Sequence, residues 1–339
     1  MTASNFSNTI SDPSTIRVGL VGTGYVAKSR AQTLYSDQRS HLVAVTGHSP
    51  ETTAAFCQEF NAQLVPNWLE LVQRDDLDLI IISTINRDHG AIAKAALEND
   101  KHVVVEYPLC LDPQQGQELI ALASRRQKLL HVEHLELLGG LHNAIKAALE
   151  AIGTVFYARY STINPQRPAS HRWTYQNSLF GFPLVGALSR LHRLTDLFGA
   201  VASVNAQSQF WNVDSDRDRY RSCWCQTQLH FTCGTIGEVV YGKGETFWES
   251  ENLFTLYGEA GTLIFTPKGG QLLQGDIPQP IEVGSRSGLF VRDTQMVLDH
   301  LFDGTPLYVS NADSLYTLKV ADAARQSAET GETVILTQS

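Results

Sequence analysis

The segment Val21-Gly22-Thr23-Gly24-Tyr25-Val26-Ala27 decides the fold. It joins a short β-type run, Ile16–Val21, to a stretch with apolar residues at helical spacing, Ala27–Tyr35. In such a strand–turn–helix unit the first glycine allows a tight turn, the second lets the backbone approach a pyrophosphate, and the small third residue lets the helix pack on the strand. We therefore predict a dinucleotide site; the alternative is a glycine-rich turn without a ligand. The predicted cofactor-binding residues here are Gly22, Thr23, Gly24, Tyr25, Val26 and Ala27.

Strands and helices alternate on both sides of this segment. The apolar runs lack alternation, as expected of strands that are covered on both faces. Ser49-Pro50 begins a helix, with Ser49 as the N-cap. The other strands are expected at Leu42–Thr46, Asp78–Ser83, His102–Glu106 and Leu129–Val132, and the other helices at His89–Glu98 and 113–126. Repeated strand–helix–strand units predict a parallel, doubly wound sheet of the Rossmann type.

The pattern changes after about residue 135, where half-buried strands with alternating polarity predominate. We expect strands at Val155–Ser161, Val204–Trp211, Trp224–Phe231, Thr235–Tyr241, Leu253–Tyr257 and Thr262–Phe265, and helices near Leu184–Phe198, Phe290–Phe302 and Asn311–Glu329. A length of 339 residues is typical of two domains. The predicted fold class is α/β: a flexible N-terminus at 1–15, a Rossmann domain at 16–134, and at 135–339 an α+β domain around a large, mostly antiparallel open sheet that binds substrate.

Composition excludes several classes of protein. Twenty-six Lys and Arg against 35 Asp and Glu give a net charge of −9, which argues against nucleic acid or an anionic membrane as the main partner. The first residues have no signal-peptide pattern, and no apolar run reaches the length of a membrane span. Five cysteines, an odd number, favour a reducing compartment, so we expect a cytoplasmic protein. We interpret Cys223 and Cys225 as packing residues, and we expect no metal site.

The end of the second strand bears on the choice of cofactor. An acid there binds the ribose 2′-hydroxyl of NAD and repels a 2′-phosphate. The sequence instead has His48 and Ser49 at this place, with no acid before Glu51. His48 and Ser49 are therefore candidate contacts of a 2′-phosphate, and we expect NADPH to be preferred, with NADH as a weaker cofactor. The alternative is that Ser49 only caps its helix.

Several segments carry a family resemblance. The two-domain layout, the glycine fingerprint and His102–Pro108 resemble the glucose–fructose oxidoreductase/inositol dehydrogenase family. That family usually has Glu-Lys-Pro where this chain has Glu106-Tyr107-Pro108, and Glu-Tyr-Pro looks like the biliverdin reductases. Segments similar to those reductases are Lys128–Leu138, Phe180–Pro183, Leu188–Leu191 and Leu197–Gly199.

The resemblance implies hydride transfer from NADPH to the central methine carbon of biliverdin, an open-chain tetrapyrrole, giving bilirubin. It also implies a monomer or a weak homodimer. The first alternative is a sugar or polyol dehydrogenase of the same family. Tyr107 replaces the lysine of those enzymes and Ser189 their histidine, which counts against that activity. The second alternative is a cofactor-binding regulator without turnover.

The resemblance also indicates which residues carry the chemistry. We expect Arg190, in an apolar helix, to face the substrate, with an ion pair at the domain interface as the alternative. Arg193, on the same helix face, is a candidate second anion contact or else a surface residue. Tyr107 is expected near the nicotinamide or as a packed strand-end aromatic. Thr84 and His89, in a loop that is close to the cofactor in the family, and Glu106 are further candidate cofactor contacts, with structural roles as the alternative.

Overall fold

A computed structural model describes residues 15–336, so the predicted flexible N-terminus lies almost wholly outside the described part. The described residues form two compact units. The first holds residues up to Leu135 together with Gly288–Leu315, and the second holds 136–287 with the residues from Tyr316 onward. The sequence analysis had placed 288–315 with the second domain, so the structure differs in this segment.

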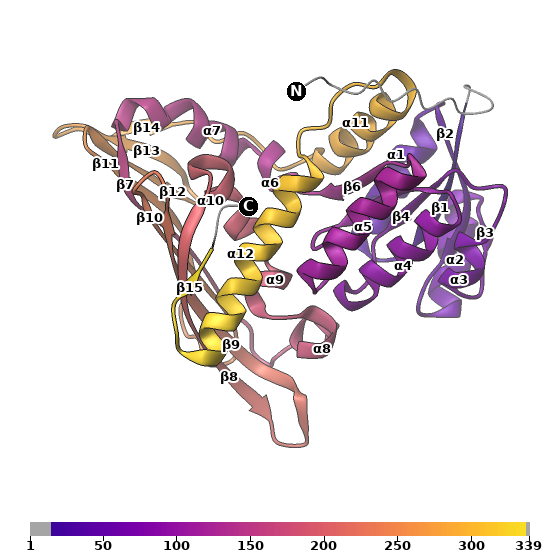
Figure 1. Ribbon diagram of the computed structural model, residues 1–339, viewed down its shortest axis with the longest axis horizontal. Coiled ribbons are helices and arrows are strands. Elements are labelled where there is room, and N and C mark those ends of the chain that lie inside the picture. Colours follow the sequence, from indigo (N-terminus) through magenta and orange to yellow (C-terminus); the bar gives the residue numbers. More distant parts are fainter. Residues whose placement is uncertain (1–14, 337–339) are drawn as a thin grey trace. The chain divides into compact units, whose positions relative to one another are not determined.

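The first unit is built on a six-stranded parallel sheet in the order β3-β2-β1-β4-β5-β6 (Figure 1). The strands are β1 (Ile16–Val21), β2 (Ser40–Thr46), β3 (Gln63–Leu64), β4 (Leu79–Ile82), β5 (His102–Glu106) and β6 (Leu130–Glu133). This order is that of a dinucleotide-binding doubly wound fold, with its switch point between β1 and β4. The predicted Rossmann sheet is confirmed.

Two helices of the first unit begin at the residues that the sequence indicates. The side chain of Ser49 accepts a hydrogen bond from the backbone of Thr52 at the start of one helix, and Asp112 caps another through Gln114 and Gln115. The helices are α1 (Tyr25–Ser36), α2 (Pro50–Phe60), α3 (Trp68–Val72), α4 (Asn86–Glu98), α5 (Pro113–Arg126) and α11 (Leu289–Asp303). Helix α3 was not predicted, because five residues are too few to show helical periodicity.

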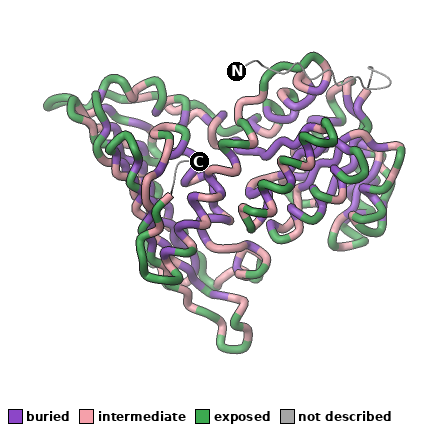
Figure 2. Tube along the Cα trace, viewed as in Figure 1, coloured by how far each residue is buried: buried purple, intermediate pink, exposed green. Residues whose placement is uncertain are grey.

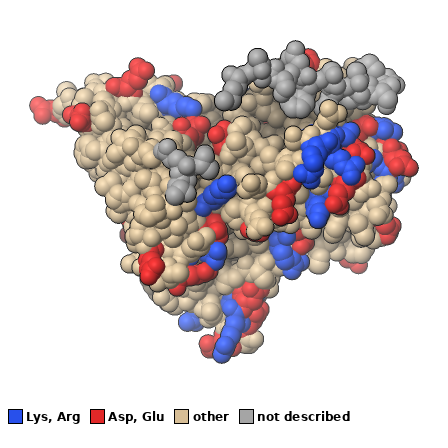
Figure 3. All heavy atoms as spheres, viewed as in Figure 1, with Lys and Arg blue, Asp and Glu red and all other residues tan. Residues whose placement is uncertain are grey.

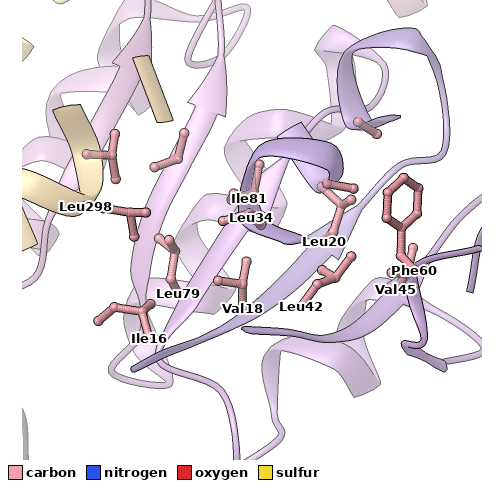
Figure 4. Close-up of a cluster of buried hydrophobic side chains, with 14 of the residues drawn as sticks. Ile16, Val18, Leu20, Leu34, Leu42, Val45, Phe60, Leu79, Ile81 and Leu298 are labelled. Atoms are coloured by element: carbon pink, nitrogen blue, oxygen red, sulfur yellow. The ribbon is translucent and has the colours of Figure 1, made fainter. Parts of the chain in front are cut away.

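The core of the first unit explains where α11 belongs. Side chains from β1, β2, β4 and α1 form one buried cluster (Figure 4). Val297, Leu298 and Leu301 of α11 lie in this same cluster. Burying such side chains stabilises a fold by about 1.5–3 kcal/mol each. The apolar face of α11 thus groups residues 288–315 with the Rossmann strands, although they come late in the sequence.

The second unit contains a nine-stranded sheet in the order β14-β13-β12-β11-β7-β10-β9-β8-β15. Among the described strands of this sheet, only β7 and β10 pair in parallel, so the prediction of a large, mostly antiparallel sheet is confirmed. The strands are β7 (Val155–Pro165), β8 (Val201–Val213), β9 (Asp216–Phe231), β10 (Ile236–Gly244), β11 (Glu251–Gly258), β12 (Gly261–Thr266), β13 (Gly269–Leu273), β14 (Gln279–Ile281) and β15 (Val334–Ile335).

The helices within the second unit are α7 (Gly140–Ala148), α8 (Asn177–Phe180), α9 (Pro183–Gly186) and α10 (Ser189–Phe198), with 3₁₀ turns η1 (Leu149–Ile152) and η2 (Trp173–Tyr175). Two further helices, α6 (Leu135–Leu138) and α12 (Asn311–Thr330), begin in the first unit and continue into the second. The single helix predicted at Leu184–Phe198 is therefore two helices. The break follows Gly186, which has low helix propensity. A Cβ on Gly186 would overlap the ring of Phe180, so the ring packs against bare backbone at the break.

Burial follows this architecture. The strands of the parallel sheet are mostly buried, whereas the helices show exposed outer faces (Figure 2). On the face seen in Figure 3, many Lys and Arg side chains lie beside Asp or Glu. Cys223 and Cys225 are buried free thiols, as expected of packing residues. Over residues 15–336, no cluster of three or more potential metal ligands occurs, and no helix has the length and apolarity of a membrane span.

Candidate dinucleotide and substrate sites

The turn after β1 has the geometry that a bound dinucleotide requires. Gly22 has a φ of +117°, and a Cβ at this position would overlap the backbone oxygen of Ser83. A side chain at Gly24, in contrast, would point into open space. Ala27 is fully buried where α1 packs on the sheet. Each small residue therefore has the local environment expected of the fingerprint.

The N-terminus of α1 is open to an anion. Gly24 is its N-cap and offers no side chain, and the first turn contains no acid. Its backbone N–H groups therefore lack the usual side-chain partner and are suited to bind phosphate oxygens. Thr23 and Val26 are half-buried at this turn, and Tyr25 is 80% exposed, with its ring 6.3 Å from that of Phe290.

The residues expected at the ribose lie at the end of β2. His48 is exposed and Ser49 half-buried. Ser49 Oγ accepts hydrogen bonds from Thr52 N, at 3.4 Å, and Thr52 Oγ1, at 3.2 Å. Its own hydroxyl proton stays available for another acceptor. Capping of α2 and phosphate binding by Ser49 are thus compatible.

His89 is buried between two loops. One ring nitrogen lies 2.8 Å from the backbone oxygen of Pro108 and the other 3.2 Å from that of Thr84. Burial lowers the pKa of this imidazole. His89 therefore ties the loop after β4 to the loop after β5, which is the structural alternative. The half-buried Thr84 is the member of this pair that can reach a ligand.

A buried ion network at the end of β5 was missed by sequence analysis. Arg30 of α1 has no exposed surface and forms ion pairs with Glu106, at 2.6 Å, and with Asp293 of α11, at 2.8 Å. Burial lowers the pKa of Arg30, but the two carboxylates outweigh this and raise it. Arg30 therefore pairs with Glu106, which is the structural role that the sequence analysis gives as the alternative to a cofactor contact for Glu106. The apolar neighbours of Arg30 along the face of α1 were the available sign that this arginine is buried. They could not identify its partner Asp293, which is 263 residues away in the sequence.

Asp293 also organises the strands next to it. Its Oδ1 lies 2.8 Å from His131 Nε2 and accepts a hydrogen bond from Tyr308 at 2.9 Å. Glu133, the register partner of Glu106, is buried beside it. Burial and the neighbouring Glu106 carboxylate raise the pKa of Glu133 well above its usual range. Glu133 is therefore more readily protonated than an ordinary glutamate.

Tyr107 directly follows this network at the carboxyl end of β5, where ligands of doubly wound folds bind. It is half-buried, and its ring stacks on that of His134 at a centroid distance of 5.6 Å and an interplanar angle of 7°. His134 is fixed by Ser314, 2.9 Å from its Nε2. The phenol is thus held rigidly, as both alternatives for Tyr107 require.

Arg190 lies in the first turn of α10, on the face of the second sheet formed by β7 and β10. Its Nε donates to Thr162 Oγ1 at 3.3 Å and its Nη1 to Ser189 Oγ at 3.2 Å. The guanidinium carbon is 5.4 Å from the ring centroid of Tyr241. Arg190 is half-buried, and its guanidinium is held by side chains of β7 and of its own helix.

Arg193 is placed differently from the expectation. It is 2% exposed and forms an ion pair with Glu136, which also pairs with Arg286. A guanidinium buried against its own carboxylate is a structural group, so the geometry argues against a direct anion contact and equally against a surface role. The i,i+3 spacing of Arg190 and Arg193 predicts that they share a helix face, but it does not predict how far each side chain is buried.

Lys243 of β10 is a further cation on this face that sequence analysis missed. It is 7% exposed, and its ammonium group lies among aromatic rings, two residues after Tyr241. Its rings come from strands and helices distant in sequence, so no local pattern indicated the cluster.

Family comparisons agree with this architecture. Residues 16–134 match the model described as the oxidoreductase family, NAD-binding Rossmann fold, and residues 146–336 match the model of the C-terminal α/β domain of the same family. The chain therefore belongs to the GFO/IDH/MocA family of oxidoreductases, which confirms the resemblance seen in the sequence.

Individual relatives show which members of this family the chain resembles. A solved structure of biliverdin reductase from Synechocystis sp. PCC 6803, in complex with biliverdin and NADP⁺, is 51% identical, covers 94% of this chain and 100% of its own, and has a TM-score of 0.91. Biliverdin reductase A of Mus musculus is 29% identical over 68% of each chain. An uncharacterized oxidoreductase of Escherichia coli (strain K12) is 38% identical over 119 residues, which span 35% of this chain and only 34% of that relative.

Proposed function

We propose that this protein is an NADPH-dependent biliverdin reductase, which converts biliverdin to bilirubin. The observation that carries the proposal is the 51% identity, over 94% of the chain, to a biliverdin reductase that binds biliverdin and NADP⁺. The local sequence supports it, since Glu106-Tyr107-Pro108 stands where sugar-oxidising relatives have a lysine.

The residues divide the work between the two units. NADPH, when bound, supplies the hydride. The uncapped N-terminus of α1 binds the pyrophosphate, and Ser49 and His48 contact the 2′-phosphate. Tyr107, held on His134, packs beside the nicotinamide. Arg190 stabilises the negative charge that develops on the adjoining pyrrole nitrogen when the central methine carbon accepts the hydride, and a proton from water neutralises that nitrogen to complete bilirubin.

The cofactor preference has a direct test at Ser49. The unaltered protein should prefer NADPH over NADH, mainly through KM, because no acid stands at the end of β2. Ser49→Asp should weaken NADPH binding by charge repulsion of its 2′-phosphate. Aspartate is as good an N-cap as serine, so helix α2 should remain intact. Steady-state kinetics with both cofactors measure this. Equal kcat/KM for NADPH and NADH in the unaltered protein would contradict the assignment.

Two other activities belong to this fold. A sugar or polyol dehydrogenase needs an acid/base pair, whereas this chain has Tyr107 and Ser189 at the positions concerned. A regulator would bind the cofactor without turnover. The visible spectrum of the tetrapyrrole, followed with protein and NADPH, separates these cases when a polyol panel with NAD⁺ is run beside it. Conversion of biliverdin to a bilirubin spectrum supports the proposal; oxidation of a polyol, or no turnover at all, contradicts it.

We also infer a cytoplasmic location and a monomer or weak homodimer. Five free thiols support a reducing compartment. Sedimentation across a range of protein concentrations tests the oligomeric state, and a stable tetramer at all concentrations would contradict it.

A further inference from the structure

Lys243 occupies an aromatic cage in the second unit. Its Nζ lies 4.0 Å from the ring centroid of Phe180, 4.7 Å from that of Tyr175, 5.3 Å from that of Tyr220 and 5.8 Å from that of Tyr241. The ammonium group also donates a hydrogen bond to the backbone oxygen of Thr174. Four rings and one carbonyl therefore surround a cation that is almost removed from water.

This cation is buried without a counter-ion. Across residues 15–336 no carboxylate lies within ion-pair distance of Lys243. Removing a charge from water without a partner is costly, and ring faces return only part of that cost. A neutral apolar side chain would fill the same space more cheaply. The charge itself therefore calls for a reason beyond packing.

The cage is connected to Arg190 through one ring. Tyr241 precedes Lys243 by two residues on β10, so the two side chains lie on the same face of the sheet. The guanidinium of Arg190 lies 5.4 Å from this same ring. Two cations thus share the ring of Tyr241: the buried Lys243 and the half-buried Arg190.

We propose that Lys243 is a positioning residue for the reaction: its caged ammonium group fixes the Tyr241 ring, and that ring holds Arg190 in its working orientation. The proposal rests on the proposed function. Lys243 does not touch the substrate. It ties the segment Trp173–Phe180 to β10, and loss of its charge loosens the support of Arg190.

As the pH rises, we expect Lys243 to lose its proton before the neighbouring groups Cys223, Tyr175 and Tyr220 do. Burial, opposed by Cys223 and assisted by Arg190, lowers the pKa of Lys243 to about 8. Burial raises the pKa of Cys223 to about 11 and that of Tyr175 to about 12. Burial also raises the pKa of Tyr220. Tyr241 completes the cage, and Glu245 acts electrostatically on Tyr175.

Activity and stability should therefore respond to pH in opposite directions. Above a pH of about 8 the cage loses its cation, so kcat/KM should fall. The folded-state pKa of Lys243 lies below its ordinary value, so the folded state binds fewer protons than the unfolded chain between these two values. Deprotonation thus favours folding, and the alkaline loss of activity is not an unfolding transition.

Two substitutions separate the charge from the packing. Lys243→Met keeps an unbranched side chain and removes the charge, which buried cores usually tolerate. It should lower kcat by ~10-fold, as small misplacements of a charged group do, leave the Kd for NADPH unchanged and abolish the decline near pH 8. Lys243→Arg retains a permanent charge, so it should keep kcat within about threefold and move the decline above pH ~10. Lys268→Met, at an exposed lysine, should leave every parameter unchanged.

The measurements are pH profiles of kcat and kcat/KM with biliverdin, and near-ultraviolet circular dichroism of the tyrosine rings without substrate. A dichroism change near pH 8 in the unaltered protein, absent from Lys243→Arg, supports the proposal independently of turnover. The proposal is overturned if the dichroism of the unaltered protein does not change between pH 7 and 9.5, and this test holds even when Lys243→Met fails to fold. The proposal is also overturned if Lys243→Met folds and has the kcat and pH profile of the unaltered protein. Failure of the unaltered protein to reduce biliverdin overturns the proposed function instead, and with it the catalytic purpose of the cage.

Discussion

Replacing Arg190 with alanine should lower kcat for biliverdin reduction by ~10²–10³-fold, the usual cost of losing one donor to a developing charge. The side chain is positioned by Thr162, Ser189 and the ring of Tyr241. The guanidinium is thus already oriented before reaction, which is what electrostatic stabilisation of a transition state requires. Steady-state kinetics at saturating NADPH measure the loss.

Two controls sharpen this expectation. Arg190→Lys should recover little activity, because an ammonium group cannot reproduce the planar donor fork. The exposed Arg126, which pairs with Asp100, provides a matched Arg→Ala control that should leave kcat unchanged. Binding of NADPH should be equal in all variants. If Arg190→Ala folds normally and keeps more than about a third of kcat, Arg190 has no part in the mechanism.

Asp293→Ala should destabilise the first unit by about 3–5 kcal/mol, because it leaves a fully buried arginine with half of its countercharge. Asp293 also bonds His131 and Tyr308, so one substitution opens three contacts. Burial tends to raise the pKa of Asp293, but Arg30 and His131 outweigh this and lower it. Its contribution to stability is therefore present above pH ~4, the ordinary value for aspartate, and is lost at lower pH.

Asp299→Ala, on the same helix, is the matched control. Asp299 is 41% exposed and pairs with Arg39 at the surface, so its loss should cost less than about 1 kcal/mol. Urea-induced unfolding measures the stability of each variant, so that the two losses can be compared. Equal midpoints for Asp293→Ala and the unaltered protein would show that the buried network does not stabilise the fold.

The sequence predicted those features that local chemistry determines. Ser49 was identified as an N-cap because capping needs only the residues next to it. The strand His102–Glu106 was predicted with its true bounds, since a run of buried β-type residues needs no distant partner to be recognised. The turn at Gly22 was likewise predicted, because the glycine pattern lies within one strand–turn–helix unit. The backbone of Ser83, which excludes a Cβ at Gly22, is distant in sequence and was not predicted.

The features that were missed depend on long-range packing. Arg30 and Asp293 meet although 263 residues separate them. The cage of Lys243 takes its rings from η2, α8, β9 and β10. The helical spacing from Arg190 made Arg193 a candidate anion contact or else a surface residue, but spacing does not show that Glu136 lies against it. Depth and partner choice are properties of the assembled unit and leave no periodic signal.

The route of the hydride tests the proposed function most directly. Biliverdin is reduced by the protein with NADPH that carries two deuterium atoms at C4 of the nicotinamide, and the product is analysed by mass spectrometry and NMR. We expect bilirubin with one deuterium, located on the central methylene carbon. Unchanged biliverdin, or a product with deuterium at another position or with none, would contradict the assignment of this chain as a biliverdin reductase.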